Sequence, residues 1–213
     1  MINVNKRRHW FKFSKEEIKH LLMSWFGISL AYTILTMRGK GLEGFSFTLG
    51  LIFGFTVSAM TVGIGFLLHE IAHKYMAQKY GCWAEFRADK SMLLMAIAMA
   101  AFAGFLFIAP GAVIINGIIT KKRSGIISLA GPVSNIILGA VFLVLTLIVQ
   151  NNFLFQVMSY GLRINYFLAI FNLIPILNFD GRKIIKYNKI IYGLTVFFAL
   201  LLLPIQQVLL KII

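Results

Sequence analysis

Cysteine and acidic residues are scarce in this 213-residue sequence, which contains one cysteine and seven Asp and Glu residues. A single cysteine, Cys82, excludes an internal disulfide and a zinc cluster built from thiolates. Charged residues of both signs make up only 13% of the chain, whereas hydrophobic residues make up 59%. Together with a mean hydropathy of +0.84, this composition argues against a soluble fold and predicts a membrane protein.

The shortage of acidic residues leaves a formal net charge of +14. A basic chain can bind nucleic acid, but in a chain this apolar, Lys and Arg are expected to orient membrane helices and to contact anionic lipid. We therefore predict the lipid bilayer as a partner and no nucleic acid. No cleavable signal peptide is expected, because no small-residue cleavage site follows the first apolar run.

Long apolar runs predict an all-α polytopic membrane protein, because they are continuous and a helix satisfies its own backbone in lipid. Residues 1–19 are expected to form a basic cytoplasmic segment, and 20–213 a single transmembrane domain. Ser14 and Glu17 have the spacing of a helix start, while His20 and the polar residues 76–90 are expected at the surface or in a loop. The apolar runs lie at about 21–37, 45–75, 92–119, 125–149, 162–179 and 190–210.

The basic loops decide between five and six transmembrane helices. Six crossings would place the clusters at 121–123 and 182–189 outside, against the positive-inside rule. If 92–119 enters and leaves on one side, turning at Pro110 and Gly111, both clusters and the N-terminus lie in the cytoplasm. We expect this second arrangement, which has five crossings of the cell membrane, one re-entrant or membrane-edge β segment and the C-terminus outside.

The run at 45–75 ends in an H-E-x-x-H pattern made by His69, Glu70 and His73. This spacing places both imidazoles on one helix face, where they can bind one Zn²⁺, and the glutamate can act as a base toward water. Glu70 and Asp180 are the acidic residues in or at the ends of apolar runs, and ionisable residues there are candidates for function. A catalytic zinc takes three protein ligands, so Asp180 is the expected third ligand of one zinc per chain. Both spans end toward the cytoplasm in the preferred arrangement, so the active site is expected there.

Three motifs occur in order along the chain: HEIAH at 69–73, AGPVSN at 130–135 and FNLIPILNFDG at 171–181. Together they resemble the site-2 protease family of intramembrane zinc metalloproteases, in a compact form without a PDZ domain. The resemblance implies that Asp180 is the third zinc ligand and Glu70 the catalytic base of a protease domain at 20–213. It also implies that the substrate is a transmembrane segment of another protein. Residues 176–179 depart from the prolines and leucine that the family often has there, so the local backbone is expected to differ.

The same resemblance implies residues that contact the substrate. Asn172 and Pro175 match positions that help to break a helix and to hold an extended substrate near the metal, although Pro175 can equally be a plain kink. Asn135 matches a polar residue that bonds to the substrate or the site, or only joins helices. A segment similar to the family's membrane-edge β segment, to which a substrate strand can add, comprises Pro110, Gly111, Ala112 and Val113.

The expected function is that of an intramembrane zinc endopeptidase, which hydrolyses peptide bonds in transmembrane segments of other membrane proteins in regulated intramembrane proteolysis. The alternative is a non-proteolytic zinc-binding membrane protein, such as a transporter or a regulatory pseudo-enzyme. Glu70 favours the protease, because a transporter has no evident need for a base beside the first ligand. The sequence makes no prediction of the oligomeric state.

Overall fold

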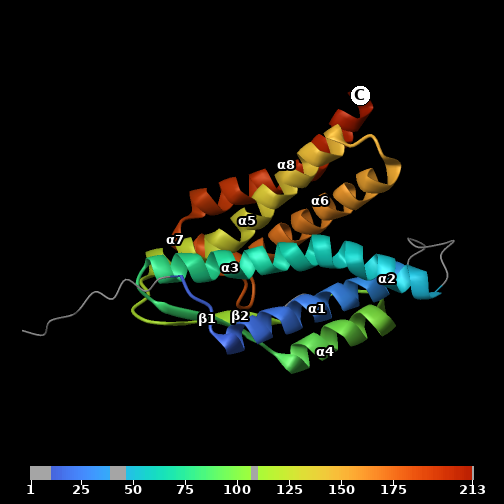
Figure 1. The fold of residues 1–213 in the computed structure, drawn as a ribbon. Helices are drawn as coiled ribbons and strands as arrows, with labels where there is room; N and C mark the ends of the chain where they lie inside the picture. The colour runs from blue at the N-terminus through green and yellow to red at the C-terminus, as the bar shows by residue number, and fades with distance from the viewer. Residues whose placement is uncertain (1–10, 39–46, 107–109, 213) are drawn as a thin grey trace, which may run out of the picture.

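The computed structural model is mostly helical, with one pair of strands (Figure 1). It describes residues 11–38, 47–106 and 110–212, so the first ten residues of the expected basic segment at 1–19 lie outside these residues. The helices are α1 (Lys15–Arg38), α2 (Phe47–Ser58), α3 (Ile64–Lys79), α4 (Lys90–Ala98), α5 (Lys121–Ile148), α6 (Asn152–Leu173), α7 (Asp180–Tyr187) and α8 (Lys189–Ile212), and the strands are β1 (Trp83–Ala88) and β2 (Gly111–Asn116).

Among the described residues, three helical segments are long and apolar enough to cross a membrane. They are α1, the segment Phe47–Lys79 and α5. In the second of these, the π-helical turn η1 (Ala59–Gly63) joins α2 to α3 without a break. Shorter apolar helices cover Lys90–Ala103 and Lys189–Leu202.

Helix α6 differs from its expected position at both ends. It begins well before the apolar run expected at 162–179, because Asn151 caps the helix by accepting from the backbone N–H groups of Phe153 and Leu154 at 3.0 and 3.1 Å. The helix ends at Leu173, close before Pro175, which has no N–H to continue it. Asp180 consequently starts the new helix α7 and does not end a span.

The expected polar loop at 76–90 contains β1, which pairs antiparallel with β2. Ala88 lies opposite Gly111, so the chain leaves β1 and returns to start β2 at the same place. Between the strands, α4 continues into the π-helical η2 (Met99–Ala103) and ends at Gly104, whose φ of 65° is left-handed. The described part of the expected apolar run 92–119 therefore comprises most of a short helix (α4 and η2) and the strand β2.

The start of α1 packs against the strands. Ser14 caps the helix as expected, because its Oγ accepts from the Glu17 backbone N–H at 3.1 Å. The expectation that His20 is merely solvated is wrong, since its Nδ1 accepts from the backbone N–H of Ala88 at 2.9 Å. The starts of α1, α5 and α7, the C-terminal end of α3 and both strands gather at one end of the molecule (Figure 1).

Candidate metal centre

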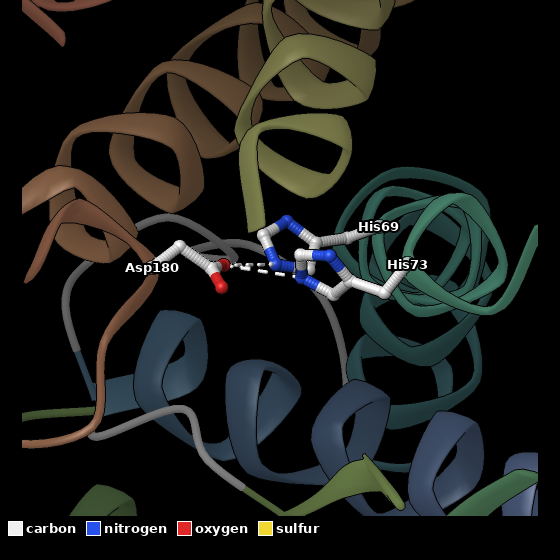
Figure 2. A group of neighbouring side chains, drawn as sticks. All are labelled: His69, His73 and Asp180. Atoms are coloured by element: carbon white, nitrogen blue, oxygen red, sulfur yellow. Dashed lines mark ion pairs between the residues drawn. The ribbon is translucent and has the colours of Figure 1, made fainter. Parts of the chain in front are cut away.

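His69 and His73 project from one face of α3 toward Asp180 at the start of α7 (Figure 2). All three side chains are buried, and their potential ligand atoms lie within 4.8 Å of one another. Asp180 Oδ2 is 3.3 Å from His69 Nε2 and 3.1 Å from His73 Nε2. The structure thus brings together the three residues that the sequence predicted as metal ligands.

These distances fit a tetrahedral zinc ion. Zinc binds imidazole nitrogen and carboxylate oxygen at about 2.0–2.2 Å, so neighbouring ligand atoms of a tetrahedron are about 3.3 Å apart. Two imidazoles and one carboxylate are also the donor types that catalytic zinc prefers. A fourth position would remain for water or substrate.

The hydrogen bonds behind the imidazoles leave the correct nitrogens for a metal. The Ile127 carbonyl can only accept, so His73 Nδ1 donates to it over 2.8 Å. Asn135 Nδ2 donates to the carbonyl of Gly65 and to Asn165 Oδ1, which fixes its amide orientation. Asn135 Oδ1 therefore accepts from His69 Nδ1 at 2.6 Å. In both histidines Nε2 is the nitrogen that can bind zinc.

Gly131 on α5 faces both metal-binding nitrogens. A Cβ atom at this position would lie 2.5 Å from His69 Nε2 and 2.5 Å from His73 Nε2. No side chain fits at that distance, so the close approach of α5 to α3 requires glycine. A glycine has no side chain whose chemistry would indicate this role in the sequence.

Asp180 is placed by the turn between α6 and α7. Gly181 packs so closely on the end of α6 that an added Cβ would lie 2.0 Å from the Leu173 carbonyl oxygen. Leu177 adopts a left-handed φ of 47° in this turn. Burial raises the pKa of the Asp180 carboxyl, but the neighbouring His73 and hydrogen bonds with both imidazoles outweigh it and hold this pKa well below its usual range. A lowered pKa favours the carboxylate form that a metal ligand requires.

A cavity of about 640 Å³ opens beside the three residues. Both histidines, Asp180 and Glu70 line it, and so does Asn172. The expected β segment lines it as well, through Pro110, Gly111, Ala112 and Val113. The cavity also contacts Ile115 and Lys183, which the sequence did not single out.

The edge of β2 that is not paired with β1 faces this cavity. Phe86 and Ala88 on β1 direct their N–H groups to side chains of α1 and not to β2. Each of them therefore forms a non-hydrogen-bonded pair with its partner on β2, in which the main-chain groups of both residues point away from the opposite strand. Their partners Val113 and Gly111 do the same on β2, followed by Ile115. The sheet has two strands among the described residues, so no third strand covers this edge there.

Two expected substrate contacts lie away from the cavity wall. Asn135 is 0% exposed and uses its amide group for His69, Gly65 and Asn165. In this position Asn135 orients His69, which corresponds to the expected alternative of a bond to the site. Pro175 is exposed in the turn after α6 and is not among the residues that line the cavity.

Replacing Asn135 with Leu should weaken zinc binding about 10- to 100-fold, because partners behind a ligand fix its tautomer and orientation. Competition with a chromogenic chelator measures this affinity, and circular dichroism verifies the helical fold. Ser134→Ala is the matched control, since Ser134 Oγ donates only within its own helix, to the Gly131 carbonyl at 2.7 Å. Equal zinc affinity in both variants would contradict the orienting role.

Comparison with known proteins finds relatives but no matching solved structure. No family model matches the chain. A Methanocaldococcus jannaschii protein named as a candidate zinc metalloprotease, MJ0611, is 38% identical over 186 residues, which cover 86% of this chain and 91% of the relative. The similarly named Bacillus subtilis protein YwhC is 28% identical over 145 residues, 60% of this chain and 66% of the relative. The M. jannaschii zinc metalloprotease MJ0392 is 31% identical over 124 residues, 58% of this chain and 31% of the relative.

Proposed function

The chain belongs to the family of site-2 protease-like zinc metalloproteases, and we propose that it is an intramembrane endopeptidase that hydrolyses peptide bonds in transmembrane segments of other proteins. The observation that carries this proposal is the cavity in which His69, His73 and Asp180 meet Glu70 and an open strand edge. A metal store or transporter needs the three ligands, but it has no evident use for the glutamate or for the edge.

Peptide hydrolysis at this site would use the metal ligands, Glu70 and the residues that orient the imidazoles. Zinc, when bound by the two histidines and Asp180, would polarise the scissile carbonyl and activate a water. Glu70 takes a proton from the attacking water and delivers it to the leaving amine nitrogen, while the C–O bond forms and the C–N bond breaks. Asn135 and Ile127 hold the imidazoles in position throughout.

The substrate adds as a strand to the outer edge of β2. The main-chain groups of Gly111, Val113 and Ile115 point toward the cavity and would pair with an extended substrate. A transmembrane helix must unwind before its peptide bonds become accessible to this edge. Asn172 lies on the cavity wall near the metal group and is retained as a substrate contact, with Pro175 ending α6 so that the wall stays open.

The arrangement in the membrane is part of the proposal. We place five crossings in the cell membrane, with α6 and α8 added to the three long apolar segments because they pack along α5. The described part of 92–119 then enters and leaves the membrane on one side. The basic clusters at 121–123 and 182–189 lie at the metal end of the molecule (Figure 1), which supports a cytoplasmic active site and N-terminus. Residues 20–213 form one protease domain in this arrangement.

Cleavage of membrane helices in lipid vesicles tests the proposal. We expect the purified protein to bind about one zinc per chain and to cut at least one of a panel of transmembrane helices within its apolar segment, as located by mass spectrometry. Removal of the metal with a chelator should abolish cleavage, and added Zn²⁺ should restore it. Cleavage that persists without any bound metal would contradict zinc catalysis.

The same experiment separates the alternative function. A protein that binds one zinc per chain and cuts no helix of the panel would be a non-proteolytic zinc-binding membrane protein. Cleavage of soluble peptides alone would contradict an intramembrane substrate.

A further inference from the structure

The outer edge of β1, unlike that of β2, is occupied by side chains. The Phe86 N–H donates to Glu17 Oε1 at 3.0 Å, and the Ala88 N–H donates to His20 Nδ1 at 2.9 Å. Further along the same edge, Gln78 Nε2 donates to the Ala84 carbonyl at 3.4 Å. Exposed strand edges pair readily with other chains, so these contacts leave β2 as the accessible edge of the sheet.

Glu17 also joins this edge to the helix that carries the metal ligands. Its second carboxylate oxygen, Oε2, accepts from Lys74 Nζ, and Lys74 follows His73 on α3. The two side chains are 0% and 1% exposed. Lys74 Nζ donates further to the Lys12 carbonyl at 2.7 Å and lies 4.1 Å from the centre of the Phe13 ring. One carboxylate thus contacts both α3 and β1.

We propose that Glu17 and His20 are positioning residues that hold the β1–β2 hairpin at a fixed place relative to the metal group, and so select which substrate bond is cut. This inference rests on the proposed function. A strand added to β2 lies at a distance from the metal that depends on the position of the hairpin. Movement by one residue along a strand is about 3.3 Å, enough to bring a different peptide bond to the metal group. A hairpin without these contacts should therefore cut at several bonds.

Two double variants separate the hairpin contact from the ion pair. Glu17→Gln with Lys74→Met keeps an amide oxygen to accept from the Phe86 N–H, whereas Glu17→Leu with Lys74→Met removes that acceptor. Both variants carry uncharged side chains at positions 17 and 74, so neither leaves a single buried charge without its partner. Both also lose the contact from Lys74 to the Lys12 carbonyl. They differ only at residue 17, where glutamine keeps the acceptor for the Phe86 N–H and adds an amide NH2 group that leucine lacks.

Mass spectrometry of the products should distinguish them. We expect the Gln/Met variant to cut the same bond as the parent with a similar KM. The Leu/Met variant should cut additional neighbouring bonds and show a KM raised about tenfold, the effect of losing roughly one buried hydrogen bond. Zinc content should equal that of the parent in both. Identical cleavage sites and KM in the Leu/Met variant and the parent would overturn the proposal, whereas a parent that cuts nothing would refute the proposed function instead.

Amide hydrogen exchange tests the positioning without any substrate. The peptide covering 83–88 should exchange about tenfold faster in the Leu/Met variant than in the Gln/Met variant, and equal rates would overturn the proposal. His20→Ala provides a milder change at a half-exposed site, in case the Leu/Met variant does not fold. It should also produce additional cuts, while the exposed neighbour change Lys19→Ala should produce none. A single, unshifted cleavage site in His20→Ala would remove His20 from the positioning set.

Discussion

Replacing Glu70 with Gln should reduce the rate of substrate cleavage about 10²- to 10⁴-fold, the usual contribution of a general base. Glu70 is buried, lines the cavity and lies next to His69 on α3, outside the group of three ligands. Glutamine has nearly the same shape but cannot take the proton from water. The amount of bound zinc should consequently stay at the parent level, and single-turnover cleavage in vesicles measures the loss.

Glu16→Gln is the matched control for this prediction. It removes the same charge from an exposed position on α1 and should leave cleavage unchanged. A Glu70→Gln protein that cuts at the parent rate would remove Glu70 as the base. A Glu70→Gln protein that loses its zinc would instead assign Glu70 to holding the site together.

The ligand group was accessible from the sequence because its signals are local or compositional. The four-residue spacing of His69 and His73 determines that they share a helix face. Asp180 stands out because acidic residues are scarce in the apolar runs. These residues line one cavity because the C-terminal half of α3 and the start of α7 meet.

The contacts that the sequence did not predict join residues far apart in the chain. Glu17 and Lys74 are 57 positions apart. Glu17 lies in the basic N-terminal segment and Lys74 at the end of an apolar run, so no local pattern pairs them. Strand β1 was missed because it is short and carries charge, although Ala84 and Phe86 alternate inward as a strand requires. Local pattern therefore predicted the metal ligands but not the hairpin beside them.

Replacing Gly131 with Ala should weaken zinc binding by at least about 100-fold. Cleavage should be lost together with the zinc. The added Cβ would occupy space within 2.5 Å of both Nε2 atoms, so the imidazoles must turn away or α5 must move from α3. In either case the two Nε2 atoms and the Asp180 carboxylate can no longer bind one tetrahedral zinc ion. Chelator competition measures zinc affinity, and cleavage of the panel measures the activity.

Gly139→Ala on the same helix is the matched control. Its Cβ would meet the end of the Leu202 side chain at 2.9 Å, which can rotate away, so zinc binding should be retained. Alanine favours a helix over glycine by about 1 kcal/mol, so a loss of zinc in Gly131→Ala cannot come from a weaker α5. Parent zinc affinity in Gly131→Ala would mean that α5 does not approach the nitrogens so closely, and the geometry of the metal group would have to be revised. Loss of zinc in that variant alone would identify Gly131 as the residue whose missing side chain makes room for the ion.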